Sequence, residues 1–217
     1  MRKFLKYVLT LSFLFMLCSC GLNYETETID GKTVYKIEKK YIESDKETNL
    51  IKIDVKDKGI IIAELYPDTA PTTVENFKKL IKDKFYDGLI FHRIIKDFMI
   101  QTGDPLGTGI GGSDETIKGE FSENGVENNL SHVRGVLSMA RRGSDPETEE
   151  TMNSASSQFF IVHKDSTYLD GKYASFGKVI EGMDVVDSLA NSQTDDNDKP
   201  LNDKVINSIR FVSLLEE

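Results

Sequence analysis

The chain has 217 residues, of which 39% are hydrophobic and 29% are charged, and this suits a soluble globular domain with appended segments. Its net charge of −9 argues against a nucleic-acid partner, because nucleic-acid binding depends on basic side chains that neutralise phosphates. The same negative charge disfavours adhesion to an anionic lipid surface through charge alone.

The first twenty residues, MRKFLKYVLTLSFLFMLCSC, have the organisation of a secretory signal. A basic head precedes an apolar run that is short for a membrane span but typical of a signal peptide. The end of this run, LCSC, resembles the lipobox of bacterial lipoproteins, in which the cysteine after two small residues is acylated. The resemblance implies a signal peptide over residues 1–19, a lipid such as palmitate on Cys20, and an extracytoplasmic protein anchored to the bacterial cell membrane. An uncleaved anchor, or a secreted protein with an incidental cysteine, is the alternative.

The segment after the signal is polar and charged and has few large apolar side chains. We therefore expect a lipidated N-terminus and tether over residues 20–48, in which KTVYKIEKKYI could form a short strand or helix. The folded domain is expected over residues 49–217. Both cysteines of the chain precede residue 21, so this domain contains no disulfide and depends on its hydrophobic core.

The folded domain opens with two strands and a helix. Apolar residues alternate with charged ones in IKIDV, and KGIIIAEL follows with a glycine at the turn, which together predict a hairpin. The next segment begins near Pro71 and is closed by Gly88. Its apolar residues recur at helical spacing and predict one buried helix face, made of Val74, Phe77, Leu80 and Ile81.

The remaining chain alternates short apolar runs with glycine-rich loops. LIFHRIIKDFMIQTGD, GVLSMAR, SQFFIVH, YASFGKVI and VINSIRFVSLL have strand character, and PLGTGIGGSDET is a predicted loop. GMDVVDSLAN predicts a second short helix. Many short strands with only two helices indicate a mainly β fold, namely a closed antiparallel β-barrel capped by two α-helices. On pattern alone, an all-β sandwich is the rival architecture.

The stretch FHRIIKDFMIQTGD is unusual, because it combines large apolar residues with one arginine and one glutamine. Together with GVLSMA, SQFFI and YLDGKYASFGKVIEGMDVV, it occurs in the order and spacing of the cyclophilin family of peptidyl-prolyl isomerases. The resemblance covers residues 49–217. It implies an eight-stranded closed barrel, isomerase activity on proline-containing polypeptides, no cofactor and no metal. Nothing in the sequence suggests more than a monomer.

The resemblance also implies the site. Arg93 would project into a groove that holds an Xaa-Pro segment, and Gln101 would bond near it and near the substrate backbone. The remaining candidates are His92, which precedes the arginine, and the substrate-binding residues Phe98, Met99, Ala140, Phe160, Tyr168, Leu169 and Tyr173. Taken one at a time, each of these residues is more typical of a surface ion pair or an ordinary core. His92 in particular could be a packed structural histidine.

The chemistry of isomerisation explains why one cation among apolar walls would suffice. Resonance holds the amide planar with a barrier of about 18–20 kcal/mol, whereas the two Xaa-Pro isomers differ by only about 0.5–1 kcal/mol. No covalent bond breaks, so no nucleophile, metal or general base is required. In the twisted transition state the prolyl nitrogen becomes a hydrogen-bond acceptor. A fixed guanidinium in an apolar groove therefore favours that state selectively.

The chain departs from the family pattern at three positions and in one segment. Tyr168 stands where many members have tryptophan, which leaves cyclosporin binding open, and Tyr173 stands where histidine is common. Arg141 replaces an asparagine. The segment RRGSDPETEETMNSAS, residues 141–156, is longer than the usual link and carries four acidic residues. It is either a solvated surface loop or an acidic flap that favours basic client segments.

Two functions from different classes fit these patterns. One is an isomerase that assists the folding of secreted or surface proteins, and the other is a proline-peptide-binding chaperone or adhesin module with incidental turnover. A hydrolase finds little support, because the chain has no G-x-S-x-G motif, and it also lacks the H-E-x-x-H metal motif. The sequence does not name the client proteins or the membrane that would retain the chain.

Overall fold

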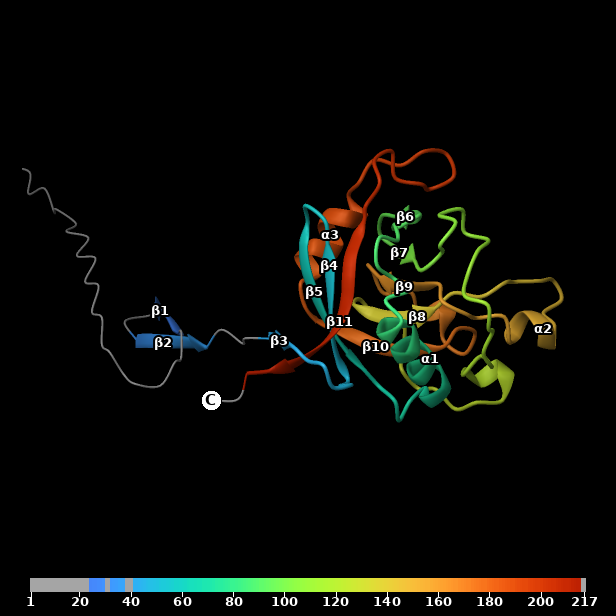
Figure 1. Ribbon diagram of the computed structural model, residues 1–217, viewed down its shortest axis with the longest axis horizontal. Helices are drawn as coiled ribbons and strands as arrows, with labels where there is room; N and C mark the ends of the chain where they lie inside the picture. The colour runs from blue at the N-terminus through green and yellow to red at the C-terminus, as the bar shows by residue number, and fades with distance from the viewer. Residues whose placement is uncertain (1–23, 30–31, 38–40, 216–217) are drawn as a thin grey trace, which may run out of the picture. The chain divides into compact units, whose positions relative to one another are not determined.

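The computed structural model of the chain describes residues 24–29, 32–37 and 41–215 (Figure 1). The predicted signal peptide and the predicted lipidation site at Cys20 lie outside these residues. The chain divides into two compact units, residues 1–40 with 214–217, and residues 41–213. In the first unit, β1 (Tyr24–Ile29) and β2 (Lys32–Ile37) form an antiparallel pair.

The described residues from Tyr41 onward form nine strands, three α-helices and two short 3-10 helices, η1 and η2. The strands are β3 (Tyr41–Glu43), β4 (Leu50–Val55), β5 (Gly59–Leu65), β6 (Arg93–Ile95), β7 (Met99–Thr102), β8 (Val136–Met139), β9 (Phe159–Val162), β10 (Ser175–Glu181) and β11 (Ile206–Leu214). The helices are α1 (Pro71–Lys82), α2 (Glu149–Met152), α3 (Met183–Ala190), η1 (Ser122–Asn124) and η2 (Thr167–Leu169).

The nine strands form one sheet in the order β3-β11-β4-β5-β10-β8-β9-β7-β6. The mainly β prediction is confirmed, but eight strands and two helices are too few. The additional strand β3 comes from the predicted tether, where Ser44 N donates to Phe211 O of β11 at 2.9 Å. The additional helix α2 lies in the long segment 141–156, where the side chains and backbones of Thr148 and Thr151 cap its first turn reciprocally.

The strand ladders of this sheet do not close it into a barrel, because β3 and β6 stand at opposite ends of the order. The region between β6 and β11 is instead crossed by a single β-bridge, between Ile90 and Val205. Two backbone bonds accompany it, from Phe91 N to Lys204 O at 2.9 Å and from Ile94 N to Asp198 O at 2.8 Å. The loop that precedes β11 therefore lies along the outer side of β6.

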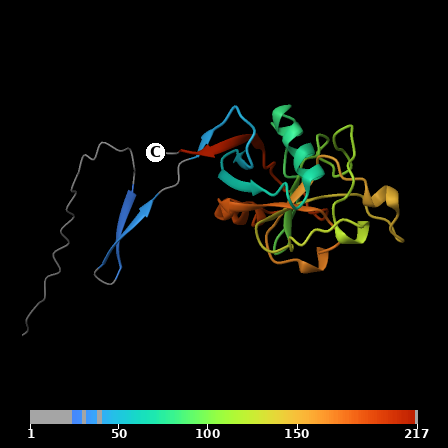
Figure 2. The same cartoon turned by 90° about the horizontal axis from the view of Figure 1, so that it is seen from below.

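Helix α1 forms as its sequence predicts. Pro71 occupies the first turn, where its missing N–H removes no helical bond, and the four predicted apolar residues are all buried. Phe77 is fully buried, and its ring lies 5.0–5.1 Å from the rings of Tyr86, Phe159 and Phe176. This helix face thus packs against the middle of the main core. Figures 1 and 2 show α1 and α3 on different sides of the strands.

The strands β6 to β9 are apolar on both faces, and this determines where a site can lie. Successive side chains of a strand point to opposite faces. In β9, Phe159 and Ile161 join the main core, whereas Phe160 and Val162 belong to a second, smaller apolar cluster. In β7, Ile100 joins the main core and Met99 joins the second cluster. The sheet therefore separates the main core from a second apolar face.

Candidate active site

The register of four strands builds a row of side chains on the second face. Arg93 of β6 lies opposite Gln101 of β7, Gln101 lies opposite Phe160 of β9, and Phe160 lies opposite Ser138 of β8. Residues directly opposite each other in an antiparallel pair have their side chains on the same face. A cation, an amide and an aromatic ring predicted from separate motifs are thus neighbours. We call these residues, Arg93, Gln101, Phe160 and Ser138, the site row.

The predicted apolar wall also gathers on this face. Met99, Phe160 and Leu169 are buried in the second cluster, with exposed fractions of 1%, 5% and 8%. Partly buried apolar side chains pack against them, among them Phe98, Ala140 and Tyr173. The Tyr173 ring meets the Phe160 ring edge-on at 6.0 Å. The structure therefore brings the predicted wall residues together beside the cation.

Tyr168 lies at the rim of this wall rather than inside it. Its side chain is 64% exposed, and its ring lies 6.0 Å from the Phe98 ring at an interplanar angle of 31°. An aromatic surface therefore remains where many cyclophilins have tryptophan. The phenol hydroxyl of tyrosine does not occupy the place of an indole N–H, so the expectation for cyclosporin stays open.

The two polar residues of the row have separate partners. Arg93 Nε donates to Asp198 Oδ2 at 3.2 Å, and the arginine side chain is 43% exposed. Gln101 Nε2 donates to Gln158 Oε1 at 2.8 Å. Gln158 Nε2 in turn donates to Gly109 O at 2.9 Å and to Gly111 O of the glycine-rich loop at 2.7 Å. Gln101 thus faces Arg93 across the strands while its own bond joins it to this loop.

The glycine-rich loop beside the row is organised by one buried carboxylate. Asp104 accepts backbone N–H bonds from Leu106 at 2.8 Å, Thr108 at 2.9 Å and Gly109 at 2.6 Å. Burial raises the pKa of Asp104, but these backbone donors outweigh it, so the pKa lies below its ordinary value. Gly103 has a φ of +89°, and a Cβ there would lie 2.3 Å from Ser157 O, so only glycine fits.

His92 does not join the site row. Its side chain is buried beside the glycine-rich loop, and within the described part of the chain neither ring nitrogen has a hydrogen-bond partner. Burial lowers its pKa below the ordinary 6.5, and the Asp104 carboxylate only partly opposes this shift. The position is that of a packed neutral histidine, which gives the ring no direct access to a peptide at the site row.

We expect His92 to make the protein less stable as the pH falls. Because its pKa is lower in the folded state than in the unfolded chain, its contribution to stability is complete above about pH 6.5 and is lost below that pH. Urea unfolding at about pH 7.5 and about pH 5.5 should give a smaller free energy of unfolding at the lower pH. His92→Gln should reduce this difference, and an equal difference in both proteins would contradict the assignment.

A second buried histidine supports the aromatic wall from behind. His132 Nδ1 lies 2.8 Å from Asp170 Oδ1, and its Nε2 lies 2.9 Å from Ser138 Oγ. Its ring stacks against Phe160 at 6.1 Å. The order Asp–His–Ser is that of a hydrolase triad, but Ser138 is fully buried and His132 is 1% exposed. A substrate cannot reach this serine, so the three residues brace Phe160.

Sequence reasoning missed the partners that join the site row to the rest of the fold, namely Asp198, Gln158, His132 and Asp170. Asp198 and Asp170 lie in loops, and Gln158 immediately precedes a strand. Their roles depend on pairing between distant segments, which no local spacing encodes. The neighbouring SQFF motif was the one available signal for Gln158.

Arg141, which departs from the family pattern, is almost completely enclosed. Its guanidinium donates to both carboxylate oxygens of Glu147, at 2.9 and 3.2 Å, and to Lys172 O at 3.0 Å. Its Cζ lies 4.8 Å from the Tyr173 ring centre and 5.2 Å from that of Phe121. The first cause that lowers the Glu147 pKa is this bond to Arg141. The long segment is thus fastened to the wall residue Tyr173.

We expect Arg141→Met to loosen the segment around α2. The variant keeps the apolar stem but removes the bidentate pair, so a glutamate-specific protease should cleave after Glu149 or Glu150 about five-fold faster. Arg142→Met is the matched control, because the Arg142 side chain is 64% exposed and its pair with Glu150 is long, at 3.3 Å. Equal cleavage rates for the two variants would show that Arg141 does not fasten the segment.

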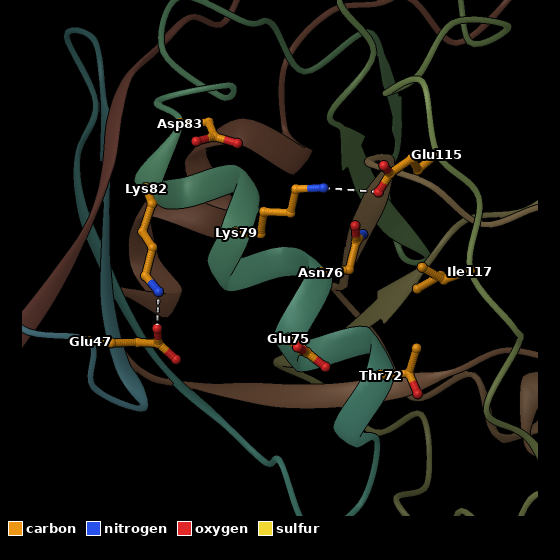
Figure 3. A pocket seen from close by; sticks show the side chains of 9 residues that line it. All are labelled: Glu47, Thr72, Glu75, Asn76, Lys79, Lys82, Asp83, Glu115 and Ile117. Carbon is orange, nitrogen blue, oxygen red and sulfur yellow. Dashed lines mark hydrogen bonds and ion pairs between the residues drawn. The ribbon is translucent and has the colours of Figure 1, made fainter.

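A hollow beside α1 is a second place where a ligand could lie (Figure 3). Its charged side chains are paired, because Lys79 Nζ lies 2.9 Å from Glu115 Oε2 and Lys82 contacts Glu47. Paired charges offer little to a charged ligand. The lining is Glu47, Thr72, Glu75, Asn76, Lys79, Lys82, Asp83, Glu115 and Ile117, and it contains one aliphatic side chain. The site row with its apolar wall is the stronger candidate.

Two further searches cover only residues 24–29, 32–37 and 41–215. In these residues, no cluster of histidine, cysteine, aspartate and glutamate has an arrangement that could hold a metal ion. Across the same residues, no helix combines the length and the apolar character needed to cross a membrane.

Comparisons with known proteins identify the class to which this fold and site belong. Residues 50–211 match the family model described as cyclophilin type peptidyl-prolyl cis-trans isomerase/CLD. The chain therefore belongs to the cyclophilin-type peptidyl-prolyl cis-trans isomerase family, and its activity is peptidyl-prolyl cis-trans isomerisation.

Individual relatives agree with this assignment. The chain is 43% identical over 144 residues to peptidyl-prolyl cis-trans isomerase ppi1 of Schizosaccharomyces pombe, covering 66% of this chain and 86% of the relative. It is 47% identical over 146 residues to peptidyl-prolyl cis-trans isomerase cypE of Dictyostelium discoideum, covering 67% and 86%. It spans only 22% of the longer isomerase cyp15 of Rhizopus delemar.

A solved structure shows the same fold. The chain is similar to a cyclophilin type peptidyl-prolyl cis-trans isomerase of Cryptosporidium parvum, crystallised in the presence of the dipeptide Ala-Pro. The TM-score is 0.67 and the sequence identity 33%, and the match covers 76% of this chain and 99% of the other.

Proposed function

We propose that the site row and its apolar wall form the groove in which this isomerase binds and turns an Xaa-Pro segment. The observation that carries the proposal is the placement of the Arg93 guanidinium on the same sheet face as buried Met99, Phe160 and Leu169. This is one cation beside an apolar wall, which is the inventory that isomerisation requires. The crystallisation of the Cryptosporidium relative with Ala-Pro supports a proline-containing ligand.

In this proposal each part of the groove has a defined task. The proline ring lies on the wall of Phe160, Met99 and Leu169, where burial of its methylene groups holds it in place. The guanidinium of Arg93 donates to the prolyl nitrogen, which accepts a hydrogen bond only when the amide is twisted. Gln101 lies opposite Arg93 and is oriented by Gln158, so its carbonyl oxygen is available to a donor of the substrate backbone.

The rival function is a proline-peptide-binding chaperone or adhesin module with incidental turnover. Catalysed cis/trans exchange in an Ala-Pro peptide, measured by NMR line shapes, separates the two. Catalysis that depends on Arg93 supports the groove, because binding of an apolar proline ring does not require that cation. Tight peptide binding without Arg93-dependent exchange would favour the binding module.

The cellular setting is a further part of the proposal. The LCSC sequence supports acylation of Cys20 after removal of residues 1–19. The enzyme would then be an extracytoplasmic bacterial lipoprotein that speeds proline isomerisation in secreted or surface proteins, a step that takes tens of seconds when uncatalysed. The relatives described above are eukaryotic, so this setting is supported by the N-terminal sequence alone.

Metabolic labelling tests the setting. The full chain, expressed in a bacterial host with an alkyne-labelled fatty acid, should become labelled and should sediment with membranes. Cys20→Ser should abolish both, whereas Cys18→Ser, which changes the other cysteine of the same segment, should leave both intact. Loss of label in the Cys18→Ser variant alone, or no label in the wild type, would overturn the lipoprotein assignment.

A further inference from the structure

We propose that Asp198 is a positioning residue that holds the Arg93 guanidinium in the orientation needed for isomerisation. The inference rests on the proposed function of the site row. It adds a residue from a segment more than a hundred positions along the chain from Arg93, in the loop between α3 and β11. Three observations support it, namely the construction of this loop, its attachment to β6, and the atom of Arg93 that it contacts.

The loop is built to present Asp198 in one place. Asp195 Oδ1 accepts the backbone N–H groups of Asn197 and Lys199, both at 2.9 Å, and Asp195 N donates to Lys199 O at 2.8 Å. Asp198 itself has a φ of +63°, in the left-handed region that aspartate tolerates better than most residues. Its carbonyl oxygen accepts the N–H of Ile94 at 2.8 Å, which attaches the turn to β6 directly beside Arg93.

The contact is made to the inner nitrogen of the guanidinium. Asp198 Oδ2 lies 3.2 Å from Arg93 Nε, and within the described residues this is the one hydrogen bond of the Arg93 side chain. A bond at Nε restricts rotation of the guanidinium plane and leaves both terminal nitrogens available to a substrate. Gln101 does not take over this task, because its amide nitrogen is bonded to Gln158.

The magnitudes separate a positioning role from a stabilising one. Both side chains are about two-fifths exposed, at 43% and 40%, and exposed ion pairs contribute only about 0–1 kcal/mol to folding. The bond is therefore a minor term in stability. Catalytic rates, in contrast, are sensitive to misplacement of a reacting group by about 1 Å.

Charge and orientation predict opposite effects when the carboxylate is removed. If charge alone mattered, loss of Asp198 would make the groove more positive and would favour the transition state further. If orientation matters, the guanidinium becomes mobile and turnover falls. A fall in kcat therefore identifies positioning, and a rise identifies simple electrostatics.

The test uses Asp198→Gly in the full chain, because glycine adopts a φ of +63° without strain and removes only the carboxylate. On an Ala-Pro peptide we expect kcat to fall about five-fold with little change in KM. Asp198→Asn, which keeps an acceptor oxygen, should fall less. Asp196→Gly is the matched control, since it removes an exposed carboxylate of the same loop, and it should retain wild-type turnover.

Two further measurements show whether the effect passes through Arg93. Asp198→Gly should have no effect in an Arg93→Ala background, because the group that it positions is absent. In ¹⁵N-labelled protein, the Arg93 Nε–H resonance should shift in Asp198→Gly and stay in place in Asp196→Gly. A merely structural role of the turn would move neither readout selectively.

The outcomes distinguish this inference from the proposed function. If Arg93→Ala loses turnover but Asp198→Gly keeps it, or if Asp198→Asn loses as much as Asp198→Gly, the positioning role is overturned while the groove stands. Equal losses from Asp198→Gly in the wild-type and Arg93→Ala backgrounds would also overturn it. Normal turnover in Arg93→Ala would overturn the groove and this inference together.

Discussion

Replacing Arg93 with alanine is expected to lower kcat/KM for Ala-Pro exchange at least about ten-fold, which corresponds to about 1.4 kcal/mol of transition-state stabilisation. The reason is selective. The planar ground state offers no lone pair at the prolyl nitrogen, so the guanidinium stabilises the twisted state without stabilising the bound substrate equally. The loss should therefore appear mainly in kcat, whereas peptide affinity, which depends on the apolar wall, should change little.

The measurement is exchange between the cis and trans signals of the peptide, followed by NMR at several enzyme concentrations. Arg134→Ala is a suitable control, because Arg134 is 41% exposed, as Arg93 is to within two percentage points, and is also ion-paired, to Asp187 at 2.7 Å. Arg93→Lys should lie between wild type and alanine, since lysine keeps the charge but not the planar fork. Turnover by Arg93→Ala within two-fold of wild type would remove the cation from the mechanism.

Phe77→Ala should be among the most destabilising single substitutions, with a loss of about 3–5 kcal/mol in the free energy of unfolding. The Phe77 ring is fully buried between α1 and the sheet and meets three other aromatic rings. Its removal leaves a cavity that surrounding rings cannot fill without leaving their own contacts. For a domain of this size we expect the melting temperature to fall by roughly 6–20 °C.

Urea unfolding measures this loss, and Tyr168→Ala provides the comparison. Tyr168 is 64% exposed, so removing its ring should change the free energy of unfolding by less than about 0.5 kcal/mol. Because Phe77 faces the main core and not the site row, folded Phe77→Ala should keep near-normal turnover at low temperature. A small loss of stability would show that the core repacks around the missing ring.

The sequence predicts best those elements whose residues specify them locally. The periodicity of α1 and the alternation in β4 reflect burial on one face, and both appear in the structure as expected. The strand β3 was not predicted within the tether, because YIE has no apolar alternation of its own and is a strand only through pairing with β11. The helix α2 was missed because it is one turn long and depends on Thr148 and Thr151.

The candidate site divides in the same way. Arg93 and the wall residues Met99 and Phe160 were predicted from motifs, and strand register places them on one face. Strand alternation within β7 and β9 is enough to separate them from the core. Asp198, in contrast, reaches Arg93 through a turn that no pattern in FHRIIKDF anticipates. Whether an acidic residue solvates itself or meets a distant arginine depends on tertiary contacts.

The strand β9 supplies both the main core and the groove from four consecutive residues, FFIV, all of them buried. A change to its groove-facing side chains therefore disturbs packing around their core-facing neighbours. Altered preference among peptide sequences is accordingly easier to obtain at the rim, where Tyr168 and the long segment 141–156 can vary with little effect on folding. An engineer seeking a new client range should randomise the rim and leave the strand untouched.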